Sequence, residues 1–153
     1  MSAICIIDTT VFLEILNVPN KATLHKNIIQ ELETKIKNEE VLFMPMATII
    51  ETGNHIAQNG NGHQKRKAAE KFVEQINLAI EGKSPFTPID FLTKQKLSSW
   101  LAEFPNLAMT GLGIGDVSII KDWEFQCSLH LSRRVYIWTL DCHLQSYDRA
   151  ARI

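Results

Sequence analysis

Four short apolar runs are spaced along this chain and separated by segments with helical periodicity. The runs predict strands over residues 3–7, 41–44, 86–89 and 135–139. The periodic segments predict helices over residues 11–16, 24–36, 47–58, 63–81, 97–104 and 116–131, with a short C-terminal helix that contains Leu144. Because the runs are apolar on both faces, they favour a parallel sheet that helices cover on both sides. The sequence therefore predicts an α/β fold with three layers, α/β/α, around a central parallel sheet.

The length and composition of the chain favour one globular domain over residues 1–153. A chain of this length buries roughly 68–70% of its unfolded surface, so its core needs no metal or disulfide. Uncharged apolar stretches such as Val41–Ile50 fall far short of the roughly 18 residues of a membrane span, so we expect no transmembrane segment. There is no pattern of a secretory leader, and three scattered cysteines (Cys5, Cys127 and Cys142) suit reduced thiols. We expect a cytoplasmic protein.

Basic side chains do not dominate this sequence, since 16 Lys and Arg face 17 Asp and Glu for a formal charge of −1. A protein that holds duplex DNA by phosphate neutralisation alone has a clear basic excess. Two local basic patches, at residues 63–71 and at Arg133-Arg134, could follow a phosphate backbone or form an ordinary solvated surface. Any nucleic-acid role therefore rests on local patches or on bound metal.

Four of the acids follow expected strands or begin expected helices, and each has apolar neighbours in the sequence. They are Asp8, Glu51, Asp116 and Asp141. In open α/β sheets, ligands bind beyond the carboxyl ends of the strands. We therefore expect these four side chains to lie near one another at that edge of the sheet.

Carboxylates that converge repel one another, and each resists ionisation unless a cation is present. Hard oxygen ligands without paired Cys or His point to Mg²⁺ or Mn²⁺ rather than to zinc. Two such ions can hold the attacking and leaving oxygens of a phosphodiester. A simpler interpretation applies to each acid alone: Asp8 and Asp116 as helix caps, Glu51 as a first-turn partner of the helix dipole, and Asp141 as a turn residue.

The four acids stand in sequence contexts that resemble the ordered acidic motifs of the PIN-domain nucleases, including toxin ribonucleases of the VapBC type. These contexts are Ile-Ile-Asp8-Thr-Thr10, Ile-Ile-Glu51, Gly-Ile-Gly-Asp116 and Ile-Trp-Thr139-Leu-Asp141. The resemblance implies a PIN-like fold and a metal-dependent ribonuclease. It also implies that Asp8, Glu51 and Asp116 are the principal metal ligands, that Asp141 completes the site, and that Thr10 and Thr139 orient carboxylates or waters.

The resemblance leaves the biological role open. An RNA substrate, a small antitoxin protein and a homodimer are the partners it suggests. A second hypothesis is a catalytically silent PIN-fold module that binds protein or RNA. A third is a metal-dependent phosphatase, or a nuclease of related fold that acts on DNA.

Other groups of residues carry weaker signals. Asn54 and His55 follow Glu51 by three and four residues, so they share its helix face and could support the site. Cys142-His143 suggests a thiol nucleophile or, with Cys127 and His130, a zinc set. Adjacent side chains usually point apart and no Cys-x-x-Cys pair is present, so a buried structural thiol is favoured. Asp122 lies about 240° around the helix from Asp116, so we expect it to face elsewhere.

Overall fold

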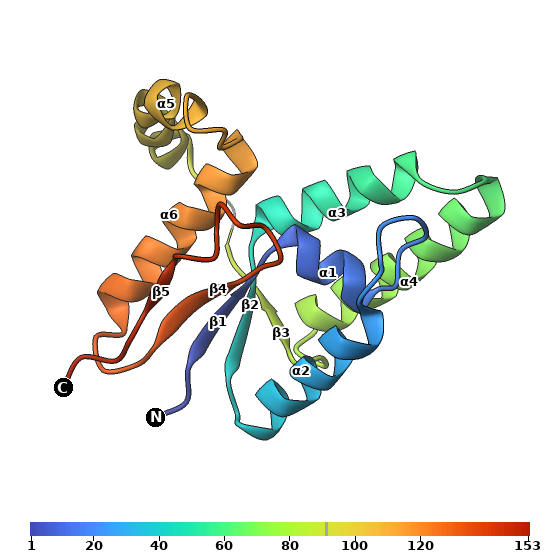
Figure 1. Ribbon diagram of the computed structural model, residues 1–153, viewed down its shortest axis with the longest axis horizontal. Helices are drawn as coiled ribbons and strands as arrows, with labels where there is room; N and C mark the ends of the chain where they lie inside the picture. Colours follow the sequence, from blue (N-terminus) through green and yellow to red (C-terminus); the bar gives the residue numbers. More distant parts are fainter. Residues whose placement is uncertain (91) are drawn as a thin grey trace.

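The four apolar runs form the parallel strands of one sheet in the computed structural model, which describes residues 1–90 and 92–153 (Figure 1). The strands are β1 (Ile4–Ile7), β2 (Val41–Met44), β3 (Phe86–Pro88) and β4 (Val135–Trp138). They lie in the order β3-β2-β1-β4-β5, and β1 pairs with β2 on one side and with β4 on the other. The predicted α/β architecture with a central, mostly parallel sheet is confirmed.

Alternate residues of the central strand face two separate apolar clusters. Cys5 and Ile7 point into a cluster that α1 to α4 complete, whereas Ile4 and Ile6 point into a cluster that α5 and α6 complete. The helices are α1 (Thr9–Ile15), α2 (His25–Lys37), α3 (Met46–Gln58), α4 (Gly62–Ile80), α5 (Lys94–Ala108) and α6 (Ile114–Leu129). This arrangement is the predicted three-layer α/β/α order.

The C-terminal segment differs from the prediction. Residues 142–146 form turns rather than a helix, and they lead into a two-residue strand, β5 (Asp148–Arg149), which pairs antiparallel with β4. Leu144 is fully buried, and Tyr147 packs against the same apolar cluster beside Trp123. The Arg149 guanidinium donates hydrogen bonds to the carbonyls of Cys127, His130 and Arg133. These contacts hold the segment against the end of α6. The segment therefore keeps its position without an amphipathic helix.

Several helix boundaries also differ from the prediction by two to four residues, including the end of α5 and the start of α6. Pro105 does not end α5, which continues to Ala108, because Phe104 and Leu107 pack against the apolar cluster and hold the last turn in place. Helix α6 begins at Ile114, two residues earlier than predicted, so Asp116 is its third residue rather than its first.

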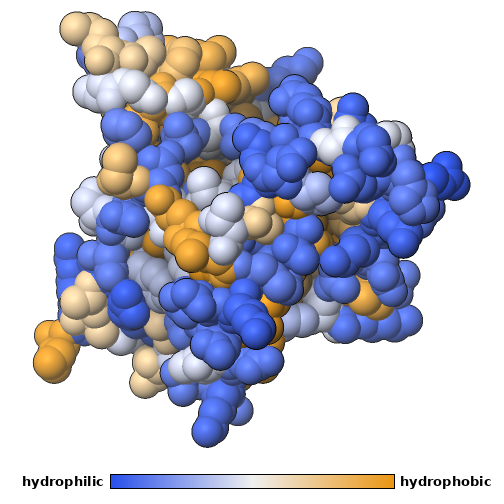
Figure 2. All heavy atoms as spheres, turned by 45° about the vertical axis from the view of Figure 1, so that its right-hand side comes forward, coloured by the Kyte–Doolittle hydropathy of each residue, from blue (hydrophilic) through white to orange (hydrophobic). Residues whose placement is uncertain are grey.

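The surface differs between the two helical layers. Figure 2 shows hydrophilic residues over the side that comes forward, where α3 and α4 lie, and apolar residues over the α5 end of the molecule. None of the helices in residues 1–90 and 92–153 combines the length and hydropathy needed to span a bilayer.

Candidate metal centre

Asp8 follows β1 directly and lies at the N-cap position of α1. Its side chain is only 3% exposed, and it makes no capping hydrogen bond to the helix. Instead, one oxygen, Oδ2, accepts a hydrogen bond of 2.7 Å from the Thr10 hydroxyl and another of 2.7 Å from the Thr139 hydroxyl. Because Thr139 follows β4, these bonds join the ends of two neighbouring parallel strands. The orientation of Asp8 is therefore not explained by helix capping.

The two threonines are themselves fixed by backbone groups of the turn after β4. The Thr10 hydroxyl accepts the N–H of Leu140 at 3.0 Å, and the Thr139 hydroxyl accepts the N–H of Asp141 at 2.9 Å. Each hydroxyl proton is thereby left to point at Asp8 Oδ2. No donor from the described residues reaches the second oxygen, Oδ1, and this atom is not among the buried atoms that lack a partner. Asp8 thus keeps one oxygen open at the rim.

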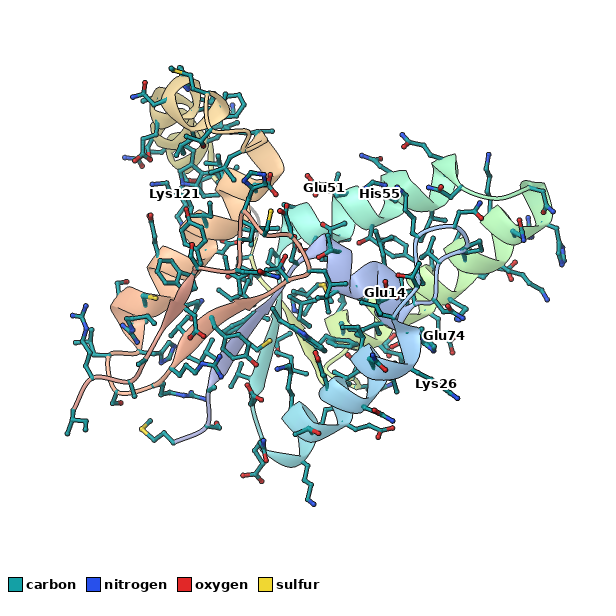
Figure 3. The ribbon with its side chains drawn as sticks, viewed as in Figure 1. Glu14, Lys26, Glu51, His55, Glu74 and Lys121 are labelled. Carbon is teal, nitrogen blue, oxygen red and sulfur yellow. The ribbon has the colours of Figure 1, made fainter. Side chains whose placement is uncertain are left out.

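Glu51 reaches the same region from the second turn of α3, where it is labelled in Figure 3. Its Oε2 accepts a hydrogen bond of 3.1 Å from the Thr9 hydroxyl. Its other oxygen lies against the backbone of Gly115, where an added Cβ would stand 1.8 Å from Oε1. A side chain at residue 115 would therefore displace the Glu51 carboxylate. Glycine lets α6 approach α3 at this point.

Asp116 lies in the first turn of α6, and its Oδ2 accepts the N–H of Gly113 at 3.1 Å. Partial burial raises the pKa of this carboxyl, and the nearby charges of Asp8 and Asp141 raise it further. The hydrogen bond from Gly113 and the proximity of His143 act in the opposite direction. Asp116 is thus an acid at a helix terminus whose pKa is also raised by neighbouring acids.

The pKa of Glu51 is raised chiefly by burial, and the charges of Asp116 and Asp8 add to the shift, whereas the Thr9 hydrogen bond lowers it. The structure therefore brings together four acids from four parts of the chain, each near enough to another to affect its ionisation. Their donors are all carboxylate oxygens, which are the ligands that Mg²⁺ and Mn²⁺ prefer. This donor set fits a hard divalent cation, which would relieve the repulsion.

The four acids do not form a tight cage. Within residues 1–90 and 92–153, one set of three acid, His or Cys ligand atoms has all its members within 4.8 Å of one another, and it consists of Asp141, Cys142 and His143. Asp8, Glu51 and Asp116 are more widely spaced than that. Such spacing suits an ion that keeps several of its own waters, as Mg²⁺ does.

The predicted supporting residues divide into two groups. Thr10 and Thr139 bind Asp8 directly, as described above, whereas Asn54 and His55 make no hydrogen bond with the four acids in the described part of the chain. The pKa of His55 is lowered by burial and by Lys21, which lies in the loop after α1. The charge that acts on His55 is thus that of a lysine outside the group of four acids. Sequence reasoning missed Thr9 and the close approach at Gly115.

The weaker sequence signals also have clear outcomes. Cys142 is exposed rather than a buried structural thiol, because it lies in the turn that follows Asp141. Cys127 is partly buried, and it is not among the ligands that gather around Asp141.

The basic patches are partly occupied by contacts within the chain. On α4, Lys71 binds the carbonyl of Leu16 and Arg66 pairs with Glu70 at 3.1 Å. The two adjacent arginines before β4 are also engaged, by Ser2 and by Asp148. These partners favour structural and solvated roles for the patches.

The chain has a three-layer α/β fold that is PIN-like, and its four acids lie beyond the carboxyl ends of the parallel strands. The structure is similar to the crystal structure of FitAcB from Neisseria gonorrhoeae, with a TM-score of 0.56 over 90% of this chain and 87% of that chain. The two sequences are 18% identical, so the likeness concerns the fold. No protein-family model and no curated protein matches the chain.

Proposed function

We propose that this protein is an endoribonuclease that hydrolyses RNA phosphodiester bonds with Mg²⁺ or Mn²⁺ at Asp8, Glu51, Asp116 and Asp141. The observation that supports it most is the convergence of these acids: burial is the main cause of the raised pKa of Glu51 and of Asp116, and the charges of Asp116 and Asp8 add to the first shift while those of Asp8 and Asp141 add to the second. A group of carboxylates that stabilised only the fold would not be arranged to repel one another.

Asp8 and Glu51 are each positioned by neighbouring residues in the proposed site. Asp8 would hold the ion with the oxygen that the threonines leave free, because Thr10 and Thr139 bind Oδ2 and fix the plane of the carboxylate. Glu51 is held by Thr9 and backed by the Gly115 backbone. The bound metal would supply an activated water and would stabilise negative charge on the phosphate oxygens. Water adds to phosphorus, one P–O ester bond breaks, and the leaving oxygen takes up a proton.

The PIN-like fold supports the nuclease class, and the toxin of a toxin–antitoxin pair is the biological role that we propose with it. In that role the chain would meet a small antitoxin protein, and a homodimer is a further proposed assembly. A single domain is supported by the two apolar clusters, which pack on opposite faces of one sheet. We also propose a cytoplasmic location, where RNA substrates are present.

A pair of substitutions on the same helix tests this function. Asp116→Asn removes one charge from the site, whereas Asp122→Asn changes an acid that no member of the site influences. We expect Asp116→Asn to slow Mn²⁺-dependent cleavage of a labelled single-stranded RNA panel by at least about 100-fold. Asp122→Asn should cleave at the rate of the unchanged protein. Circular dichroism should show both variants folded.

Two results would contradict the proposal. Full activity of Asp116→Asn would show that the group of acids takes no part in cleavage. Absence of Mn²⁺ binding by calorimetry at millimolar metal would favour a catalytically silent module that binds protein or RNA. A parallel panel of DNA and phosphomonoester substrates would identify a DNA nuclease or a phosphatase.

A further inference from the structure

Asp141, Cys142 and His143 place three different kinds of metal ligand close together. One carboxylate oxygen, one sulfur and one imidazole nitrogen all lie within 4.8 Å of one another. We propose that these residues form a second metal site, for a borderline or soft divalent cation of the Zn²⁺ type. This site is chemically different from the set of four carboxylates, which suits a hard cation.

The bond lengths of zinc decide whether three such atoms can share one ion. Bonds of about 2.0–2.3 Å in a tetrahedron place the ligand atoms roughly 3.3–3.8 Å apart. Side-chain rotations that shorten the distances between the ligand atoms by at most about 1.0–1.5 Å therefore suffice. Thiolate and imidazole select Zn²⁺ or Co²⁺ over Mg²⁺ and Mn²⁺.

The turn after β4 explains why consecutive residues can point to one place. The Asp141 side chain accepts the N–H of His143 at 2.9 Å through Oδ1, and the Leu144 N–H binds the Asp141 carbonyl at 3.0 Å. Fully buried Leu144 anchors this turn in the core. In an extended chain, neighbouring side chains alternate in direction. Here the turn brings the three ligand atoms together before any metal binds.

The site is open to solvent and bordered by the loop that begins α6. Cys142 and His143 are exposed, and Cys142 is a free thiol. The His143 ring lies beside Gly111, where an added Cβ would stand 3.8 Å from Cε1. Three protein ligands leave the fourth position of a tetrahedral ion to water.

Asp141 belongs both to this trio and to the proposed nuclease site. If the proposed function holds, a Zn²⁺ ion on the trio would occupy the Asp141 carboxylate and add positive charge to the nuclease site. Zinc would then inhibit cleavage in competition with Mn²⁺. Metal binding by the trio does not depend on nuclease activity. The proposed zinc-type site and the proposed nuclease function can therefore be tested independently.

Cobalt titration of the reduced, metal-free protein tests the site directly. We expect one Co²⁺ per chain to bind through the thiolate and to give a thiolate-to-cobalt absorption in the near ultraviolet, which Zn²⁺ abolishes. Cys142→Ser should remove this absorption, and His143→Gln should weaken Co²⁺ binding by at least about 10-fold. Cys127→Ser is the matched control, since it changes a free thiol outside the trio, and it should keep the full signal.

The outcomes separate this site from the nuclease site. Asp116→Asn should keep the cobalt absorption while it loses Mn²⁺-dependent cleavage, and Cys142→Ser should cleave RNA with less sensitivity to Zn²⁺. An absorption that survives in Cys142→Ser, or a reduced wild-type protein that shows none at millimolar Co²⁺, would overturn the proposal. If wild type binds Co²⁺ through Cys142 yet cleaves nothing, the zinc-type site stands and the proposed function falls.

Discussion

Asp8 and Glu14 lie at opposite ends of α1 and are equally buried, each 3% exposed, yet their surroundings differ. Both oxygens of Glu14 accept backbone N–H groups, Oε1 from Thr23 at 3.0 Å and Oε2 from Leu24 at 2.9 Å. Asp8 accepts two hydroxyl groups on one oxygen and keeps the other open. In Glu14, labelled in Figure 3, both carboxylate oxygens are therefore used by hydrogen bonds within the protein. In Asp8, one carboxylate oxygen remains free to bind a ligand.

Helix α6 repeats the comparison with Asp116 and Asp122. Burial raises the pKa of both carboxyls, and that of Asp122 reaches about 6. Other acids add to the shift of Asp116, but the charge that acts on Asp122 is Lys96, which opposes the shift. Asp122 lines a separate pocket of about 620 Å³ between α5 and α6, which agrees with the prediction that it faces away from Asp116. A raised carboxyl pKa therefore favours a metal site where neighbouring acids contribute to the shift, as they do for Asp116 but not for Asp122.

The largest effect should come from Asp8→Asn. The asparagine oxygen can still accept the threonine hydroxyls, so the fold should persist, but the charge that faces the ion is lost. We expect the Mn²⁺ dissociation constant to rise by more than about 100-fold, measured by titration calorimetry. Unchanged Mn²⁺ affinity would mean that Asp8 is structural, as Glu14 is.

Gly115→Ala should disturb the site through packing alone. The new Cβ would stand 1.8 Å from Glu51 Oε1, so the carboxylate must move away from α6. We expect a loss of about 10- to 100-fold in Mn²⁺ affinity. Gly62→Ala is the matched control, because an added Cβ there meets nothing within 4 Å. Equal affinities in the two variants would show that the position of Glu51 is unimportant.

Glu14→Gln should have the opposite profile to Asp8→Asn. The neutral amide can accept only one of the two backbone N–H groups before α2, and the other would face the amide NH₂ and lose its partner. We expect a decrease of about 1–3 kcal/mol in the free energy of unfolding, measured in urea. Mn²⁺ affinity should stay within a factor of about two, and a larger loss would end the distinction between Asp8 and Glu14.

The smallest effect concerns the pH dependence of stability. Because the folded pKa of Asp122 is raised to about 6 from 3.8, the native state holds this proton more tightly than the unfolded state. Stability from this group is therefore complete below pH 3.8 and is lost as the pH rises through about 6. Between pH 4 and 7, the decrease in the free energy of unfolding should be about 1–2 kcal/mol smaller in Asp122→Asn than in the unchanged protein. This value is reduced because the Asp122 side chain is partly exposed. Parallel stability curves from pH 4 to 7 for both proteins would contradict this assignment.

Much of the fold could be predicted because the strands are short apolar runs. Alternate residues of β1 are buried on opposite faces, so all four of its residues are apolar, and the same holds for β4. The C-terminal segment could not be predicted in this way. Its position depends on Leu144, on the hydrogen bonds of Arg149 and on pairing with β4, and none of these produces a periodic pattern.

The candidate site shows the same division. The ends of strands are visible in the sequence, and this predicted the neighbourhood of Asp8 and Asp141. The separation between side chains of different helices is not visible. The contact of Glu51 with Gly115 depends on how α3 approaches α6, and the pKa of His55 is lowered by burial and by Lys21, which lies in a loop distant in the sequence. Such features follow from tertiary packing.

The strand order also sets the moment at which the site can form during synthesis. Strand β1 is made first, but its neighbour β4 is made more than a hundred residues later. Until the ribosome releases that segment, Asp8 lacks the Thr139 hydroxyl, and the turn with Asp141 does not exist. The growing chain therefore has no complete set of acids, and the finished set appears only when nearly all of the 153 residues have emerged.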